Sequence, residues 1–240
     1  MQKILKFPLS LALLLGAVPA TSCDRKDIHQ VISQMTETPA DTTGFAQKDI
    51  RMSNFSAVVV DCFADVSFFQ TAPDESPRVV LMAKQEVLDN VIARVSEEVL
   101  NISVNHRYRM PDKAVVVAKI YVPYVYRIEM NGGKCLRVGS QKINCPIEIT
   151  TNGLGAILAD SLQAPEVSIS ANGAGSVRLK GIRTADLRVS SNGAGDVVLA
   201  GQCDTGRVEV AGVGFLDVSA LAVKSQPLQL DAAGVGKIRR

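Results

Sequence analysis

The sequence predicts an all-β protein whose residues 127–240 form a solenoid, or parallel β-helix, with coils of about 20 residues, capped by an N-terminal β-rich segment. Two observations predict this fold. A glycine motif recurs at a fixed period, which is typical of stacked repeat proteins, and apolar residues alternate with polar ones on both sides of it. The copies of the motif are Asn152-Gly153-Leu154-Gly155, Asn172-Gly173-Ala174-Gly175, Asn192-Gly193-Ala194-Gly195, Ala211-Gly212-Val213-Gly214 and Ala233-Gly234-Val235-Gly236, with a contracted copy at Asn131-Gly132-Gly133.

Each coil is expected to contain two strands joined by the glycine turn. In one coil, Ile147 and Ile149 alternate with polar residues before the turn, and Ile157 and Ala159 do so after it. A period of two indicates a strand with one buried face, and the linking stretch adds one more apolar residue, Leu162. A single coil buries about six apolar side chains, worth roughly 1.5 to 3 kcal/mol each. Ordering the backbone costs roughly 1 to 2 kcal/mol for every residue, so the coils must stack to be stable.

Stacking places equivalent residues in columns along the solenoid, and the asparagines of the motif form one such column. Two interpretations are open: a row of ligand or metal donors on one face, or an internal ladder in which each amide bonds to the next coil. The ladder is favoured because turn geometry already requires these residue types. The glycines are expected to supply positive φ angles and close approach between coils. The predicted structural ladder consists of Asn131, Asn152, Gly153, Gly155, Asn172, Gly173, Gly175, Asn192, Gly193 and Gly195.

No cofactor or metal site is predicted at the glycine motifs. A phosphate-binding loop is disfavoured because no third glycine stands at the fingerprint spacing and a strand, not a helix, is expected to follow. Gly193-Ala194-Gly195-Asp196 resembles a fragment of a calcium-binding repeat, but that repeat has a much shorter period. The acidic position is also replaced in the other coils, by Ala156, Ser176 and Phe215.

Residues 49–126 are predicted to form a β-rich capping segment. Because this length is small for an independent core, residues 49–240 are expected to make one structural domain. Apolar residues at helical spacing predict a short helix or helical turn within Lys84–Glu98. The predicted strands are Ala57–Asp61, Asp65–Gln70, Arg78–Met82, Leu100–Asn105 and Ala114–Val122.

The amino terminus has the pattern of an export signal, predicted to span residues 1–22. Lys3 and Lys6 precede an apolar run that is too short to cross a membrane and fits a secretory h-region. Small residues lead into Cys23, so the segment resembles a bacterial lipoprotein signal, in which Cys23 carries the lipid. The alternative is an ordinary cleaved signal peptide with an incidental cysteine. The predicted location is the outer membrane, at the cell surface or facing the periplasm.

Residues 23–48 are polar and are expected to form a flexible tether. The whole chain contains 26 Lys and Arg residues against 24 Asp and Glu residues. Removal of Lys3 and Lys6 with the signal leaves the mature chain formally neutral, so nothing favours nucleic acid as a partner. The expected partners are the membrane, through the lipid anchor, and an envelope protein or a glycan. The oligomeric state stays open.

Four cysteines remain once Cys23 is set aside. An exported chain permits disulfides, and four cysteines allow three complete pairings between which the sequence does not choose. Buried free thiols are the other possibility. The spacings do not match a zinc site, which His29 and His106 would have to complete. The four residues are Cys62, Cys135, Cys145 and Cys203.

No catalytic residues are predicted. His29 lies in the predicted tether, and His106 has no neighbouring nucleophile. Tyrosines could stack on sugar rings, although tyrosines in strands more often pack with the hydroxyl at the rim. The three close together are Tyr121, Tyr124 and Tyr126. The outward column after the turn does not build the acid pair that polysaccharide-cleaving enzymes use. That column consists of Arg137, Leu158, Arg178, Val198 and Asp217.

The repeated Asn-Gly-x-Gly motif follows Ile120-Tyr121-Val122-Pro123 and Ile128-Glu129-Met130-Asn131-Gly132. Together these segments resemble the family of auto-transporter adhesins with a head GIN domain, over roughly Phe45 to the end of the chain. The resemblance implies an exported, often lipid-anchored, right-handed β-helical protein. It provides no functional residues to transfer, because a similar shape indicates a shared fold more reliably than a shared function.

Three functions follow as hypotheses. The leading one is a lipid-anchored solenoid that presents a repetitive surface for adhesin-like binding. The second is a periplasmic structural or scaffolding lipoprotein that binds another envelope protein, which exposed apolar residues such as Leu158 and Val198 would suit. The third is a polysaccharide-active enzyme, disfavoured because no catalytic constellation is present in the sequence.

Overall fold

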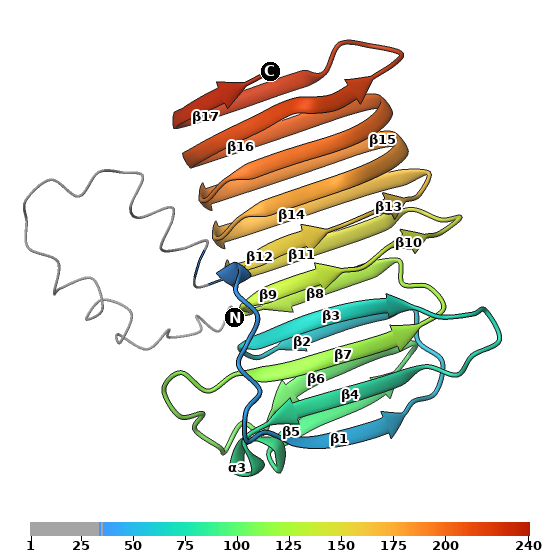
Figure 1. The fold of residues 1–240 in the computed structure, drawn as a ribbon, viewed down its shortest axis with the longest axis vertical. Coiled ribbons are helices and arrows are strands. Elements are labelled where there is room, and N and C mark those ends of the chain that lie inside the picture. The colour runs from blue at the N-terminus through green and yellow to red at the C-terminus, as the bar shows by residue number, and fades with distance from the viewer. Residues whose placement is uncertain (1–33, 35) are drawn as a thin grey trace, which may run out of the picture.

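The computed structural model describes residue 34 and residues 36–240 (Figure 1). The predicted signal peptide, residues 1–22, and the predicted lipid-attachment residue Cys23 lie outside the described residues. Strands make up 64% of the structure and helices 3%, and parallel coils of about 21 residues stack into a β-solenoid of about five turns. The predicted all-β solenoid is therefore confirmed. In the described part of the chain, no helix has the length and apolar character needed to cross a bilayer.

Successive coils of the solenoid pair in parallel with equivalent residues in register. Asn152 pairs with Asn172, and Gly153 pairs with Gly173. This register converts the sequence period into columns of like residues that run along the solenoid. The strands are β8 (Arg127–Asn131), β9 (Cys135–Val138), β10 (Gln141–Lys142), β11 (Ile147–Leu154), β12 (Ala156–Ala159), β13 (Leu162–Gln163), β14 (Glu166–Ala174), β15 (Val177–Ala194), β16 (Val197–Val223) and β17 (Gln229–Arg239).

The ladder of strand pairing continues through the glycine bends. β11 and β14 extend beyond the Asn-Gly pair, and β15 and β16 each continue around the corners of a coil. The predicted turn that separates two strands is present between β11 and β12, between β14 and β15, and between β15 and β16, whereas β16 and β17 each run through a complete copy of the motif. Pairing survives the bend because the neighbouring coil bends at the equivalent residue, so the two backbones stay parallel.

The N-terminal segment continues the solenoid and closes one end of it (Figure 1). β2 pairs in parallel with β8, and β3 with β9, so both halves belong to one sheet. At the outer end β4 pairs antiparallel with β1 and β7, and β5 with β6. The strands are β1 (Ala46–Arg51), β2 (Ala57–Asp61), β3 (Ala64–Gln70), β4 (Arg78–Ala83), β5 (Val91–Ser96), β6 (Val99–Val104) and β7 (Val116–Val122).

The short helix or helical turn predicted within Lys84–Glu98 is present as a single turn. Helix α3 spans only Gln85–Leu88, and the following residues form strand β5. β5 and β6 are joined by a two-residue hairpin loop in which Glu97 and Glu98 both have positive φ angles, 52° and 60°. Such loops usually carry Asn-Gly or Asp-Gly. The predicted helical turn is therefore present as α3, whereas Val91, Ile92 and Val95, whose spacing also suggested a helix, lie in strand β5 because the Glu-Glu loop carries none of the usual hairpin residues.

The capping segment and the solenoid share one hydrophobic core. A single cluster of buried residues runs from Phe55 in the cap to Val218 near the last coils. Phe68 of β3 stands where the two halves meet: it is 1% exposed, and it pairs with Ile120 on one side and with Val138 on the other. Because the core is continuous, the halves are expected to unfold together.

Candidate functional site

The asparagines of the glycine motif stack into a ladder of side-chain amides. Nδ2 of Asn152 donates to Oδ1 of Asn131 at 2.8 Å, and Nδ2 of Asn172 donates to Oδ1 of Asn152 at 3.1 Å. Asn192 continues the ladder with a 3.2 Å bond to Asn172. At the cap end, Asn131 donates to a carboxylate oxygen of Asp61 at 2.8 Å. These amides bond to one another, as the internal-ladder interpretation expects.

The two glycines of each motif meet different requirements. The first glycine has a left-handed backbone, with φ angles of 111° at Gly153, 131° at Gly173 and 139° at Gly193. The second glycine is needed for space, because a Cβ on Gly175 would overlap the backbone carbonyl oxygen of Gly155 in the preceding coil. At Gly173 and Gly193 a side chain is therefore excluded by backbone conformation and by contact, and at Gly175 and Gly195 by contact alone, whereas a Cβ on Gly155 would have an ordinary van der Waals distance of 3.7 Å.

Residues 36–40, here called the docking segment, lie against the solenoid. Glu37 accepts a hydrogen bond from Nε of Arg178 at 2.8 Å, and Thr36 is fully buried. The sequence places this segment in a flexible tether covering residues 23–48, but these contacts hold it in place. Composition alone suggested a tether because the partners of Glu37 lie more than a hundred residues away in sequence.

Asp65 anchors the docking segment from the solenoid side. Its carboxylate accepts a hydrogen bond from the backbone N–H of Ala40 at 2.9 Å and forms an ion pair with Arg137. Nζ of Lys134 lies 3.7 Å from the same carboxylate, whose side chain is only 5% exposed. One buried acid thus connects the docking segment to two cations of the first coil.

We expect Asp65→Asn to destabilise the protein by about 1 to 3 kcal/mol, because it leaves two largely buried cations without their carboxylate. The free energy of unfolding in urea checks this, together with the hydrogen exchange rate of the Ala40 amide, which should rise. Asp49→Asn is the matched control. Its partner Arg78 is exposed, so its loss should cost less than about 1 kcal/mol. Equal effects of the two substitutions would contradict the anchoring role.

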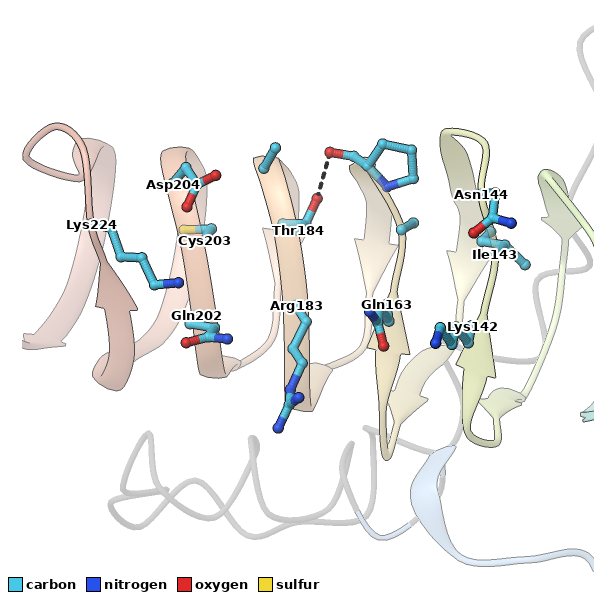
Figure 2. Close-up of a pocket in the computed structure, with 13 residues that line it drawn as sticks. Lys142, Ile143, Asn144, Gln163, Arg183, Thr184, Gln202, Cys203, Asp204 and Lys224 are labelled. Atoms are coloured by element: carbon cyan, nitrogen blue, oxygen red, sulfur yellow. Dashed lines mark hydrogen bonds between the residues drawn. The ribbon is translucent and has the colours of Figure 1, made fainter.

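A trough of about 520 Å³ crosses successive coils on one face of the solenoid (Figure 2). Its side chains come from equivalent positions. Lys142 pairs with Gln163, Gln163 with Arg183, and Arg183 with Gln202. Lys224 directly follows β16, and in Figure 2 its side chain extends toward the coil of Gln202. The volume lies within the range of ligand sites, about 300 to 1,000 Å³. The trough is lined by Lys142, Ile143, Asn144, Gln163, Ala164, Pro165, Arg183, Thr184, Ala185, Gln202, Cys203, Asp204 and Lys224.

The trough was not predicted from the sequence. In each linking stretch only the apolar residue, such as Leu162 or Ile182, indicated a role, which was a place in the core. The residue after each of these, Gln163 or Arg183, is polar and exposed, and it recurs with the period of the coils. Aligning the coils on the linking stretch instead of on the glycine motif would have revealed this polar column.

The cysteines of the described residues are free thiols. Burial, followed by the nearby Asp61, raises the pKa of Cys62 to about 12. Burial is also the main reason why the pKa of Cys135 is raised to about 12 and that of Cys203 is raised. Cys145 is only half-buried. None of the three buried thiols is therefore suited to be a nucleophile near neutral pH.

We expect Cys145 to be the thiol that a disulfide reagent modifies in the folded chain carrying Cys23→Ala. The others should react only after unfolding, because their thiols are buried and stay protonated. Counting labelled thiols by mass spectrometry, before and after adding denaturant, checks this. Rapid native labelling of Cys62 would contradict the burial described here.

The three tyrosines do not form one stacking surface. Tyr121 is stacked on Phe69, with ring centroids 4.9 Å apart, and the Arg78 guanidinium lies 4.4 Å from the Tyr121 ring. Tyr124 is 52% exposed and lines a separate cavity of about 460 Å³ in the cap. Tyr126 is exposed as well. Tyr121 therefore has protein partners, and the trough itself contains no aromatic side chain.

Metal ligation has no support in the described part of the chain. Within residues 34 and 36–240, no group of three or more His, Cys, Asp or Glu side chains could hold a metal ion. The trough has a single carboxylate, that of Asp204. What the trough offers to a ligand is therefore cationic and amide groups.

Comparison with known proteins adds a family and a fold. A family model described as "Putative auto-transporter adhesin, head GIN domain" matches residues 54–239. A crystal structure of a putative adhesin from Bacteroides fragilis is similar, with 17% sequence identity and a TM-score of 0.62. The match covers 81% of this chain and 96% of that chain. A search among curated proteins gives no match.

Two further crystal structures come from Parabacteroides distasonis. One is a putative adhesin with 13% identity and a TM-score of 0.58, covering 81% of this chain and 96% of that chain. The other is a putative lipid binding protein with 16% identity and a TM-score of 0.59, covering 82% and 96%. At these identities, the likeness shows a shared fold and does not transfer a ligand.

Proposed function

The chain belongs to the family described as "Putative auto-transporter adhesin, head GIN domain", and on this basis we propose that it is an exported, lipid-anchored protein that binds an extended ligand in the trough. The observation that carries the proposal is the course of the trough. It crosses the strands, so a linear ligand lying in it contacts equivalent side chains on successive coils. Solenoid proteins commonly bind ligands on extended surfaces of this kind.

The chemistry of the trough favours binding over catalysis. Glycoside hydrolysis uses two carboxyl groups at a defined separation, and the lining of the trough contributes one, from Asp204. Its Cys203 is buried, and burial raises the pKa of the thiol. The proposed role is therefore that of an adhesin-like binding protein and not of an enzyme.

Lipid attachment at Cys23 would hold the solenoid at the membrane, because each buried methylene of an acyl chain contributes about 0.8 kcal/mol. We expect Cys23→Ala to leave the fold intact and to release the protein from the membrane fraction. Immunoblots of fractionated cells check this. Cys145→Ala, which keeps the proposed lipid site, serves as the control and should stay with the membrane. Persistence of Cys23→Ala in the membrane fraction would contradict the anchor.

A glycan-binding screen with the full-length Cys23→Ala chain tests the proposed use of the trough. Ala185 is exposed in its lining, so Ala185→Trp should obstruct the trough and abolish binding. Ala220→Trp introduces the same ring at an exposed position outside the lining and should have little effect. Equal loss in both variants, or no glycan bound by the parent chain, would contradict the proposal.

A further inference from the structure

We propose that the trough recognises a linear acidic polysaccharide in which an anionic sugar alternates with a neutral one. This inference rests on the proposed binding function and specifies the ligand for it. Its basis is the unneutralised positive charge in the trough and the spacing of that charge along the solenoid.

Three cations in the trough face a single acid. Lys142, Arg183 and Lys224 are exposed, and among the described residues none of them forms an ion pair. Asp204 supplies the only carboxylate of the lining. Since the mature chain is formally neutral, this face carries a local excess of positive charge. An anionic ligand is the natural counterpart of such a surface.

Cations on the neighbouring faces are arranged differently. Lys180 pairs with Asp160, Arg188 with Glu166 and Asp186, and Arg207 with Glu209. A solenoid surface that only needs solubility would be expected to carry such mixed, mutually compensating charges. The trough departs from that pattern at Lys142 and Arg183, whose neighbours in register are glutamines, whereas Lys224 lies on the coil next to Asp204.

The register of the coils fixes the spacing of these groups. Lys142, Gln163, Arg183 and Gln202 occupy equivalent positions on successive coils, so cation and amide alternate. Neighbouring strands lie about 4.8 Å apart, which separates the first two cations by about 9.6 Å. A carboxylate or sulfate group on every second sugar suits the cations. The amides of the intervening glutamines suit the hydroxyls of the neutral sugars.

The side chains themselves favour a glycan over a nucleic acid. The Arg183 guanidinium can bind a carboxylate or sulfate with two parallel hydrogen bonds. Single-stranded nucleic acids are usually held by bases stacked on aromatic side chains, and the lining contains none. The thiol of Cys203, with its raised pKa, stays neutral and does not oppose an anion.

Hyaluronan oligosaccharides, which carry one carboxylate on every second sugar, are the probe, and dextran oligosaccharides of equal length are the uncharged comparison. Binding to the full-length Cys23→Ala chain is measured by calorimetry at several salt concentrations. We expect hyaluronan to bind and dextran not to bind. Affinity for hyaluronan should fall as salt is added, because the contacts are exposed charge pairs.

Charge-removal variants test whether hyaluronan binds in the trough. Lys142→Gln, Arg183→Gln and Lys224→Gln combined should weaken hyaluronan binding about tenfold or more, since each exposed pair contributes a few-fold. Lys180→Gln, Arg188→Gln and Arg207→Gln combined remove the same charge from the paired positions and should change binding less than about threefold. Equal losses in the two triple variants would overturn the inference.

A charge-conserving pair of substitutions tests whether binding depends on the spacing of the cations along the solenoid. Gln163→Arg combined with Arg183→Gln keeps the net charge and moves one cation by one coil, which should weaken hyaluronan binding several-fold. Unchanged affinity would overturn the alternating-sugar inference. Tighter binding of dextran or of single-stranded DNA than of hyaluronan would overturn the inference that the ligand is an acidic polysaccharide. In either case the proposed binding function would still stand if Ala185→Trp abolished binding of the preferred ligand. If the glycan screen gave no ligand at all, the proposed binding function would be contradicted as well.

Discussion

Replacement of Gly173 by valine is expected to destabilise the protein by at least about 3 kcal/mol. Gly173 has a φ of 131°, which costs a β-branched residue about 1 to 3 kcal/mol in strain. The new Cβ would also overlap the carbonyl oxygen of Gly153, so the two coils must separate, which lengthens the hydrogen bond that Nδ2 of Asn172 donates to Oδ1 of Asn152. The midpoint and slope of urea unfolding measure the loss.

Gly44→Val is the control for this substitution. Gly44 has a φ of 73°, but a Cβ there would meet no atom within 4 Å. The control therefore carries the strain of a positive φ, about 1 to 2 kcal/mol, without a collision between coils. If both substitutions lowered the free energy of unfolding equally, the close contact between coils at Gly173 would contribute nothing to the effect. An unchanged urea midpoint for Gly173→Val would contradict the bend itself.

Phe68→Ala is expected to cost about 3 to 5 kcal/mol, the usual range for truncating a fully buried phenylalanine. Phe68 lies between β7 of the cap and β9 of the first coil, so the cavity would weaken both halves. We expect unfolding to remain a single transition at a lower urea concentration, followed both by far-UV circular dichroism and by tyrosine fluorescence. The tyrosines report on the cap and the dichroism on the whole sheet.

Phe69→Ala provides the comparison, because adjacent residues of a strand face opposite sides. Phe69 is 41% exposed and stacks on Tyr121, so its truncation should cost about 0.5 to 1.5 kcal/mol. Two separate transitions in Phe68→Ala, one for each half, would contradict the shared core.

The solenoid could be predicted because its determinants are local and repeated. Each Asn-Gly-x-Gly copy specifies a bend, and the apolar residues beside it have a period of two, so the same inference is available several times. The cap strand predicted at Ala57–Asp61 has those bounds in the structure. Prediction failed at β5, where Glu97 and Glu98 form a hairpin loop without the usual turn residues and apolar spacing imitated a helix.

The candidate site depends on contacts between distant residues, which explains why the sequence missed it. Glu37 meets Arg178, and Ala40 meets Asp65, only after the solenoid has formed. The trough likewise exists only once the coils are in register, because Gln163 or Arg183 alone is an ordinary surface residue. Periodicity indicates that columns exist, whereas the identity of the outward side chains decides what each column can bind.

An adhesin-like role requires the trough to be accessible from outside the cell, and proteolysis of intact cells tests whether it is. The exposed loop between β6 and β7 accepts a recognition sequence for a site-specific protease between Asp112 and Lys113. That protease, which does not cross the outer membrane, is added to intact cells. We expect the full-length band to be lost from intact cells. Protection in intact cells, with cleavage after lysis, would contradict surface display and favour a periplasmic partner.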